Sequence, residues 1–241
     1  MDKKIAAIIP AYCEAPRIST VLDLVCQSEM FSRVVVVDDG STDDTAHKVK
    51  PYPVQMIRHE KNLGKGAAIQ TGLQHAGNFD LVVFLDADLT GMTRGHLQSL
   101  IDPLIESPES GMAIAQFIEG RSPVDLQQKW FAILNGQRAL TRQFTDLLPD
   151  ISWTRFGIEV FLNRFAYGLG IPFVSVPWKG VSHHLKEEKF GPVLGFYARI
   201  KMYKEALATY ATYQRRAAEL RCDQLCWDLM SENRQTAGRR A

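Results

Sequence analysis

The sequence predicts an α/β fold in which a mainly parallel sheet carries helices on both faces. Two observations support this prediction. Over the first 120 residues, short and almost wholly apolar runs rich in valine and isoleucine alternate with amphipathic stretches, and such strands are typical of a parallel sheet buried on both sides. Three of these runs also end in acidic residues or tight turns, as expected where ligands bind at the carboxyl edge of such a sheet.

The expected elements of this first part follow in regular order. Runs of β-forming residues predict strands at 5–10, 34–37, 54–58, 81–85 and 111–116. Apolar residues at helical spacing predict helices between them, at 18–27, 43–50, 64–76 and 93–105. Ser41 or Thr42 can serve as the N-cap of the second of these helices.

The pattern changes after about residue 119, and longer elements are predicted beyond that point. We expect a long helix at 125–144, softly interrupted at Gly136, and a second helix at 155–168. A strand at 173–176, a polar loop at 180–189 and a C-terminal helix at 193–230 would follow. The C-terminal helix is predicted because apolar residues recur there every three or four positions.

The chain of 241 residues is long enough for one domain with an extension. We expect a single α/β domain at 1–190, a helical extension at 191–231 and a disordered tail at 232–241. Within the domain, residues 1–120 would form a ligand-binding half and residues 121–190 a second half.

The bulk composition argues against several classes of protein. The net charge of +1 gives no reason to expect nucleic-acid binding, which usually requires a clear basic excess. No run of 18 consecutive apolar residues is present, so no transmembrane helix is predicted. The N-terminal apolar run is broken by Pro10 and Glu14, and it fits a first strand better than a signal peptide. The four cysteines do not form a metal-binding pair of pairs, which favours reduced thiols in the cytoplasm.

The strongest functional signal is a pair of aspartates after the fourth predicted strand. Asp86 and Asp88 follow the apolar run at 81–85, at the edge of the sheet where ligands bind. Two unpaired carboxylates are too costly to bury in a core. Carboxylate oxygens are the ligands that hard divalent cations prefer, and such a cation leaves room for substrate phosphates. We therefore expect a site for a metal ion and a diphosphate.

Two further loops are expected at the same edge. Asp38 and Asp39 end the second strand, and because successive side chains point to opposite faces, we expect one to contact a nucleotide and the other to fix the turn. Lys65 lies between two glycines at the start of a helix, where its charge and the helix end both favour an anion such as diphosphate. Each motif alone has a structural alternative, either a strand–helix connection or a helix cap.

Taken together, these motifs resemble the family-2 glycosyltransferases. The family pattern has Pro-Ala-Tyr-Asn-Glu after the first strand, followed by Val-Asp-Asp-Gly-Ser, Asn-x-Gly-Lys-Gly and Asp-x-Asp. This chain has the same order at 10–14, 37–41, 62–66 and 86–88, with Cys13 where the family usually has asparagine. The resemblance is strong over residues 4–120. It implies the Rossmann-like GT-A fold, a nucleotide-sugar donor and a divalent metal, Mg²⁺ or Mn²⁺.

The resemblance also implies roles for individual residues of the first half, which would bind the nucleotide sugar. The nucleoside pocket would be lined by Pro10, Ala11, Tyr12, Glu14 and Asp39. Lys65 would lie close to the donor nucleotide. Asp86 would face the ribose or the sugar and take part in the chemistry, and it would share the metal with Asp88, the main metal ligand.

The second half would bind the acceptor, and three of its residues are candidates. The sequence Arg-Phe-Gly-Ile-Glu resembles the Gly-x-Glu segment of polyprenyl-phosphate glycosyltransferases, so Glu159 would hold sugar hydroxyls or act as general base. A helix N-terminus is its structural alternative. His183 would complete the metal site, as a histidine does in GT-A enzymes that glycosylate phosphorylated small acids, with His184 in reserve and a solvated loop as the alternative. Arg138, expected beside Gln137 on a helix, would bind the acceptor, with a surface salt bridge as the alternative.

These expectations describe a metal-dependent glycosyltransferase that moves a sugar from a UDP- or GDP-linked donor to an acceptor. A polyprenyl phosphate and a soluble phosphorylated small molecule are both open as acceptors. A non-catalytic nucleotide-sugar-binding protein is the alternative from another class. Aromatic and basic residues in the C-terminal helix could contact the inner face of a membrane or pair two copies of the chain, although packing on the domain predicts the same periodicity. We expect a cytoplasmic location and no nucleic-acid partner.

Overall fold

The computed structural model describes residues 3–107, 109–118, 135–183 and 203–215. Its centre is a seven-stranded sheet in the order β3-β2-β1-β4-β7-β6-β8. In that order the strands span Gln55–Arg58, Arg33–Asp38, Ile5–Ala11, Leu81–Phe84, Arg138–Thr141, Met112–Ile118 and Phe173–Lys179. Neighbouring strands pair in parallel except at β7, which runs antiparallel to both β4 and β6. The prediction of an α/β fold with a mainly parallel sheet is confirmed.

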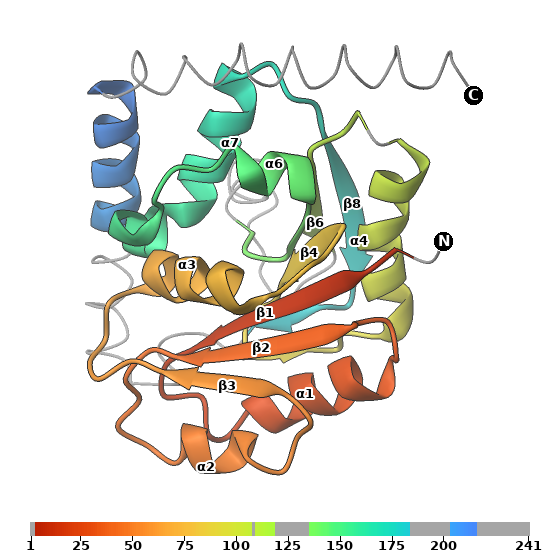
Figure 1. Cartoon of the computed structure of the whole chain (residues 1–241), viewed down its shortest axis with the longest axis vertical. Helices are drawn as coiled ribbons and strands as arrows, with labels where there is room; N and C mark the ends of the chain where they lie inside the picture. The colour runs from red at the N-terminus through yellow and green to blue at the C-terminus, as the bar shows by residue number, and fades with distance from the viewer. Residues whose placement is uncertain (1–2, 108, 119–134, 184–202, 216–241) are drawn as a thin grey trace.

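Helices cover both faces of this sheet (Figure 1). One face packs against α1 (Ile18–Gln27), α2 (Thr45–Val49) and α4 (Arg94–Glu106), and the other against α3 (Lys65–His75), α6 (Arg142–Asp146) and α7 (Ile158–Gly168). In β1, Ala7 and Ile9 belong to the first core, while Ala6 and Ile8 belong to the second. Because both faces are buried, every position of such a strand must be apolar.

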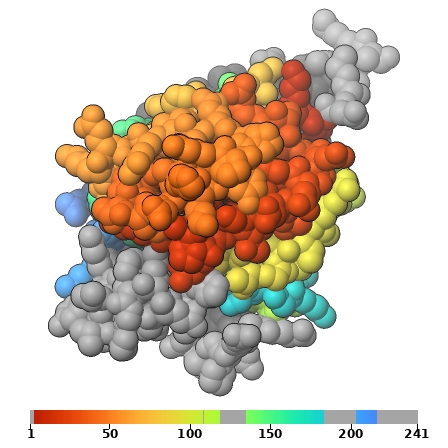
Figure 2. Space-filling model, turned by 90° about the horizontal axis from the view of Figure 1, so that it is seen from below, coloured from red at the N-terminus to blue at the C-terminus, as the bar shows by residue number. Residues whose placement is uncertain are grey.

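The N-terminal part of the chain forms one continuous side of the molecule. In Figure 2, residues of this part (red and orange) cover most of the described surface, with α4 (yellow) beside them. The order of elements from β1 to α4 follows the predicted alternation of strand and helix. The strands β1, β2 and β4, whose carboxyl ends lie at one edge of the sheet, all belong to this part.

Smaller elements complete the described structure. β5 (Leu89–Thr90) and β9 (Ser182–His183) form a separate two-stranded sheet, and a 3₁₀ helix, η2 (Ser152–Gly157), precedes α7. Residues 203–215 form a helix (blue in Figure 1). None of the helices in the described ranges combines the length and the apolar character needed to cross a bilayer.

The long helix predicted at 125–144 is wrong at its C-terminal end. Arg138–Thr141 form β7 in the middle of the sheet, and only Arg142–Asp146 are helical there, as α6. Ala139 and Leu140 are fully buried on opposite faces of the sheet. Pairing with two flanking strands overrides the helical spacing of the sequence. Residues 125–134 lie outside the described residues.

Other predicted boundaries are also revised. α7 begins at Ile158 rather than at residue 155, because the chain kinks in η2. Part of the predicted loop at 180–189 is β9. Of the helix predicted at 193–230, only 203–215 is described, and the tail predicted at 232–241 lies outside the described residues. The domain boundaries at 190 and 231 remain predictions.

Candidate functional site

The carboxyl ends of β1, β2 and β4 lie side by side in the sheet. Ala11 pairs with Asp38, and Ile8 pairs with Phe84. The turns that follow these strands therefore meet at one edge, where ligands bind in open α/β sheets. Lys65, the first residue of α3, reaches the same edge.

The turn after β1 is held by hydroxyl groups from the turn after β2. Cys13 N donates to Ser41 Oγ, and Glu14 N donates to Thr45 Oγ1, both at 2.8 Å. Ser41 therefore braces the first turn instead of capping α2, whose N-cap residue is Asp44 without a side-chain bond. Cys13 has a φ of 54°, a left-handed conformation in which asparagine is enriched. The cysteine that departs from the family pattern thus occupies a backbone position that suits asparagine.

The residues predicted to line the nucleoside pocket share this turn. Pro10 and Ala11 end β1, and Tyr12 follows directly. Burial, together with the neighbouring Cys13, raises the pKa of the Tyr12 phenol, so the phenol remains a hydrogen-bond donor at neutral pH. The Glu14 carboxylate is 3.3 Å from Arg17 Nη1, and the residue is buried. The structure therefore brings all four residues together, and their contact with a nucleoside remains a prediction.

Asp38 fixes the turn that follows β2. Its Oδ1 accepts a hydrogen bond from Ser41 N at 2.9 Å, and its Oδ2 lies 3.3 Å from Arg58 Nε. The Asp38 side chain has no exposed surface. Asp38 is thus the aspartate that pins the turn.

Asp39 fixes the loop that leads to Lys65. Its carboxylate accepts from Leu63 N at 2.9 Å and from Gly64 N at 2.8 Å, and its Oδ1 lies 2.7 Å from His59 Nδ1. Asp39 is only 3% exposed. Three of its roughly four lone-pair positions are therefore occupied by protein groups, and its contact with a nucleoside remains a prediction.

Lys65 joins three parts of the chain that are distant in sequence. Its Nζ lies 2.6 Å from Asp86 Oδ1, after β4, and 2.6 Å from Glu159 Oε1, in the first turn of α7. Gln137 Nε2 donates to Asp86 Oδ2 at 2.8 Å. A Cβ at Gly136 would lie 2.4 Å from Lys65 Nζ, so a side chain at this position would displace the ammonium group. We call Lys65, Asp86, Glu159 and Gln137 the Lys65 cluster.

The Lys65 cluster is largely withdrawn from solvent, which strengthens its ionic interactions. The side chains of Lys65, Asp86 and Glu159 are 13%, 22% and 10% exposed. Burial lowers the pKa of Lys65, but the carboxylates of Asp86 and Glu159 outweigh it and raise the pKa above 10.5. The lysine is thus charged at neutral pH. Two carboxylates face this ammonium group, and the buried guanidinium group of Arg138 acts on both of them as a second cation.

The prediction that Arg138 lies on a helix and binds the acceptor is not met in position, because Arg138 lies on β7 with no exposed surface. Its Nε donates to Asn135 O at 2.9 Å and its Nη1 to Asn163 Oδ1 at 2.6 Å. Burial lowers the pKa of Arg138 to about 10, against the opposing effect of Glu159 and Asp86. The guanidinium group therefore links β7 to α7 behind the site, and solvent does not reach it in this structure.

The two short strands bring the remaining metal candidates together along the backbone. Asp88 directly precedes β5, and Leu89 of β5 pairs with His183 of β9. No group of three or more His, Cys, Asp or Glu side chains suited to a metal ion occurs among the described residues. Both Asp86 oxygens already contact protein groups, Lys65 Nζ and Gln137 Nε2. Carboxylate oxygens are the donors that a hard divalent cation prefers, and a metal ion held by Asp86 and Asp88 remains a prediction.

Sequence reasoning missed two residues around this site. His59 lies between Asp39 and Thr71, with its Nε2 3.0 Å from Thr71 Oγ1. Arg155 contacts the loop before Lys65 through a bond from Nη1 to Leu63 O at 3.1 Å. No motif pointed to either residue, because their roles depend on which loops lie against each other.

Comparison with known proteins identifies the family. Residues 6–164 match the model of glycosyl transferase family 2. This match covers more than half of the 241 residues, so the chain belongs to this family. The resemblance predicted from the motifs is confirmed.

Curated relatives match over part of their length. A dolichyl-phosphate beta-glucosyltransferase of Trichomonas vaginalis is 35% identical in an alignment of 95 residues that covers 34% of this chain and 28% of the relative. A 4,4'-diaponeurosporenoate glycosyltransferase of Staphylococcus aureus is 31% identical over 134 residues, 51% of this chain and 36% of the relative. The chain thus spans about a third of the length of these relatives.

Solved structures give the fold. Glucosyl-3-phosphoglycerate synthase from Mycobacterium tuberculosis, in complex with Mn²⁺, UDP-glucose and phosphoglyceric acid, has a TM-score of 0.70 at 22% identity, over 87% of this chain and 79% of that chain. The same enzyme with Mg²⁺ and UDP has a TM-score of 0.69 at 22% identity, over 87% and 79%. This likeness confirms the GT-A fold.

Proposed function

We propose that this member of glycosyl transferase family 2 is a metal-dependent glycosyltransferase whose donor is a UDP- or GDP-linked sugar. The observation that carries the proposal is the Lys65 cluster, in which one ammonium group lies 2.6 Å from two carboxylates at the ligand-binding edge of the sheet. Fixed charges withdrawn from solvent are the means by which enzymes stabilise the charge that develops on a departing diphosphate.

The donor nucleoside would lie against the turns after β1 and β2, in contact with Tyr12, Glu14 and Asp39. Pro10 and Ala11 would form the adjoining wall. The bonds from Cys13 and Glu14 to the second turn support this proposal, because a pocket held in place beforehand loses little conformational entropy on binding. Lys65 would lie close to the diphosphate.

The metal would be Mg²⁺ or Mn²⁺, held by Asp88 and Asp86, with His183 as a further ligand. When bound, such an ion neutralises negative charge on the leaving diphosphate. The structures of the mycobacterial synthase contain Mn²⁺ or Mg²⁺ together with UDP or UDP-glucose, which supports the choice of metal.

Glu159 would either hold hydroxyl groups of the donor sugar or act as general base. Its carboxylate is fixed beforehand by Lys65 Nζ at 2.6 Å. If the acceptor is a hydroxyl group, a base removes its proton as the oxygen attacks the anomeric carbon. If the acceptor is a phosphate, no strong base is needed, and Glu159 would serve only to position the sugar.

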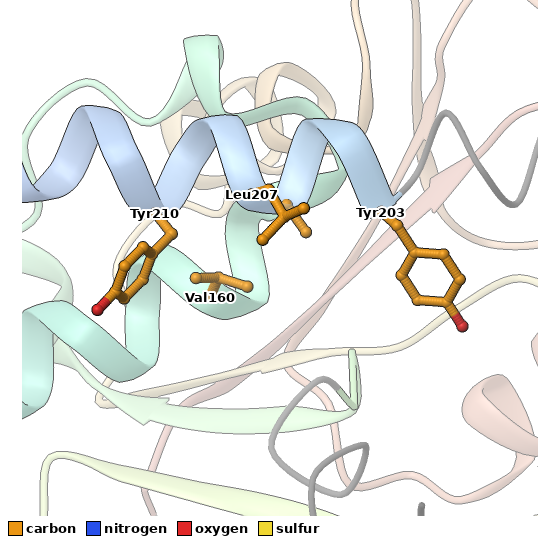
Figure 3. A pocket seen from close by; sticks show the side chains of 5 residues that line it. Val160, Tyr203, Leu207 and Tyr210 are labelled. Atoms are coloured by element: carbon orange, nitrogen blue, oxygen red, sulfur yellow. The ribbon is translucent and has the colours of Figure 1, made fainter.

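A lipid-linked acceptor, such as a polyprenyl phosphate, is our first candidate. An apolar groove of about 410 Å³ lies between α7 and the helix at 203–215, lined by Val160, Tyr203, Ala206, Leu207 and Tyr210 (Figure 3). One relative is named a dolichyl-phosphate beta-glucosyltransferase, which supports a lipid-linked acceptor. Contact of the helix at 203–215 with a membrane surface, or with a second copy of the chain, remains a prediction.

A soluble phosphorylated small acid is the second candidate acceptor. It is favoured by the likeness to a synthase whose structure holds phosphoglyceric acid. Once the donor is known, a transfer assay that offers a short-chain polyprenyl phosphate and phosphoglyceric acid side by side decides between the two. Transfer to the lipid alone would support the first candidate, and transfer to the acid alone would support the second.

Calorimetric titration with a panel of UDP- and GDP-sugars, each with and without Mn²⁺ or Mg²⁺, tests the donor and the metal. We expect one donor to bind only with metal, and Asp88→Ala to abolish this binding. Asp146→Ala is the matched control, because this aspartate is 51% exposed and pairs with Arg142 on α6. Well-folded protein that binds no donor with either metal would contradict the proposal. Donor binding without transfer or hydrolysis would favour a non-catalytic nucleotide-sugar-binding protein.

A further inference from the structure

Arg155 has a strained backbone at the junction of η2 and α7. Its φ is 49° and its ψ is −121°, a conformation that glycine adopts freely and other residues avoid. Only two other non-glycine residues in the described parts of the chain, Cys13 and Glu29, have a positive φ. Such strain persists where the surrounding structure determines the conformation, and it clusters at functional sites.

The Arg155 side chain contacts two segments that are far apart in the sequence. Its Nη1 donates to Leu63 O at 3.1 Å and its Nη2 to Asn62 Oδ1 at 3.4 Å. Its Nε donates to Glu205 Oε1 at 3.1 Å, and the other Glu205 oxygen accepts from Phe156 N at 3.4 Å. One guanidinium group therefore joins the loop before Lys65 to the helix at 203–215.

Close packing against the start of α3 explains why the backbone of Arg155 is held in this conformation. A Cβ at Gly64 would lie 3.1 Å from Arg155 Cα, and a Cβ at Gly66 would lie 3.0 Å from Arg155 N and 2.1 Å from Thr154 Oγ1. The strained turn is thus pressed against the two glycines on either side of Lys65. Four residues after Arg155, Glu159 contacts Lys65 itself.

We propose that Arg155 is a positioning residue, which fixes the loop that carries Lys65 against the helix at 203–215 and so makes the geometry of the donor site depend on that helix. The inference rests on the proposed function of the Lys65 cluster. Arg155 acts through Leu63 and Asn62, whose loop leads directly into Lys65. The strained conformation is retained because it directs the guanidinium group towards both the loop and Glu205.

Arg155→Gly removes the side-chain contacts without adding strain to the backbone. Glycine relieves the backbone strain and removes the side-chain contacts, so we expect the melting temperature to change by no more than about 4 °C. We expect donor turnover, measured as release of the nucleoside diphosphate, to fall at least ~tenfold, because small displacements of groups around the reacting atoms are costly. Donor affinity should change less, because Asp39 still holds the backbone of the loop.

Glu29→Gly is the matched control for relief of strain. Glu29 is exposed, lies just beyond α1 and has a φ of 55°. This variant should melt at the wild-type temperature or above and should keep wild-type turnover. If Arg155→Gly keeps as much turnover as Glu29→Gly, the proposal is overturned. It is also overturned if the loss of turnover merely follows a loss of folded protein.

Glu205→Gln tests the link to the helix without altering Arg155. Here the readout is amide hydrogen exchange over residues 62–68, which requires no substrate and so does not depend on the proposed function. We expect faster exchange in this segment in Glu205→Gln and in Arg155→Gly, and unchanged exchange in Glu29→Gly. Wild-type exchange in Glu205→Gln would overturn the proposal. Failure of the wild-type protein to bind any donor would refute the proposed function alone.

Discussion

At the scale of single residues, the charge of Lys65 determines the state of the site before a ligand binds. Lys65→Met keeps the length of the side chain and removes its charge, so Asp86 and Glu159 lose the cation between them. We expect the free energy of unfolding to fall by about 3 kcal/mol and donor turnover to be abolished. Urea unfolding and a donor assay measure the two effects. Lys61→Met, at an exposed position in the same loop, should change neither.

The same lysine gives a prediction for the dependence of stability on pH. Although burial lowers its pKa, Asp86 and Glu159 raise the pKa in the folded protein above the ordinary value of 10.5. Stability from such a group is fully present below the unfolded pKa and is lost as the pH rises through the folded pKa. The difference in unfolding free energy between wild type and Lys65→Met should thus be constant from pH 7 to about pH 9 and narrow at higher pH. A difference that already narrows below pH 9 would contradict this assignment.

The sequence indicated which residues gather at the site better than it indicated what each one contacts. Lys65, Asp86 and Glu159 were each proposed from a separate motif, and the structure brings them within hydrogen-bond distance. The bonds from Leu63 and Gly64 to Asp39 were not predictable, because they depend on the path of a loop. Arg138 is predicted on a helix facing the acceptor, because a sequence does not reveal that a charged side chain finds buried acceptors such as Asn163.

At the scale of elements, the contact between α3 and η2 fixes the start of α3 and requires a residue without a side chain. A Cβ at Gly66 would lie 2.1 Å from Thr154 Oγ1 and 2.7 Å from Ile151 O. Because one of these atoms is backbone, the overlap cannot be relieved by a side-chain rotation alone. We expect Gly66→Ala to destabilise the protein by about 2 kcal/mol and to weaken donor binding by moving Lys65.

A second helical glycine provides the control for this prediction. A Cβ at Gly95, in the first turn of α4, would meet only Thr93 Oγ1, at 3.7 Å. Gly95→Ala should therefore be neutral or stabilise the protein by up to about 1 kcal/mol, the gain in helix propensity. Thermal unfolding of both variants measures the contrast. Equal melting temperatures would show that α3 and η2 do not pack as closely as described.

The prediction of elements succeeded where the sequence had one repeating pattern and failed where tertiary pairing decided. From β1 to α4, continuous apolar strands and amphipathic helices alternate, and each predicted element is present. At β7, Ala139 and Leu140 are residue types that favour a helix. Only the space between β4 and β6 determines that they form a strand.

At the scale of the whole molecule, the helix at 203–215 completes the second core. The Tyr213 ring lies 5.9 Å from that of Phe161 in an edge-to-face arrangement, and its hydroxyl donates to Arg164 O at 2.8 Å. Thr209 packs closely against Gly157, because a Cβ added to this glycine would lie 2.0 Å from Thr209 Oγ1. On the side of the helix that carries Thr209 and Tyr213, the predicted spacing of apolar residues therefore reflects docking on α7.

Two substitutions on opposite sides of this helix measure how much its docking contributes to stability. Tyr213 is 7% exposed, whereas Leu207 is 69% exposed. We expect Tyr213→Ala to lower the free energy of unfolding by at least about 3 kcal/mol, through loss of a buried aromatic ring and its hydrogen bond. Leu207→Ser should change it by less than about 0.5 kcal/mol. Denaturant unfolding distinguishes the two, and equal effects would mean that the helix docks through a different face.

Tyr213→Ala should also speed amide exchange over residues 62–68, because Glu205 precedes Tyr213 by two turns on the same helix. This result would extend the link through Arg155 to the docking of the whole helix.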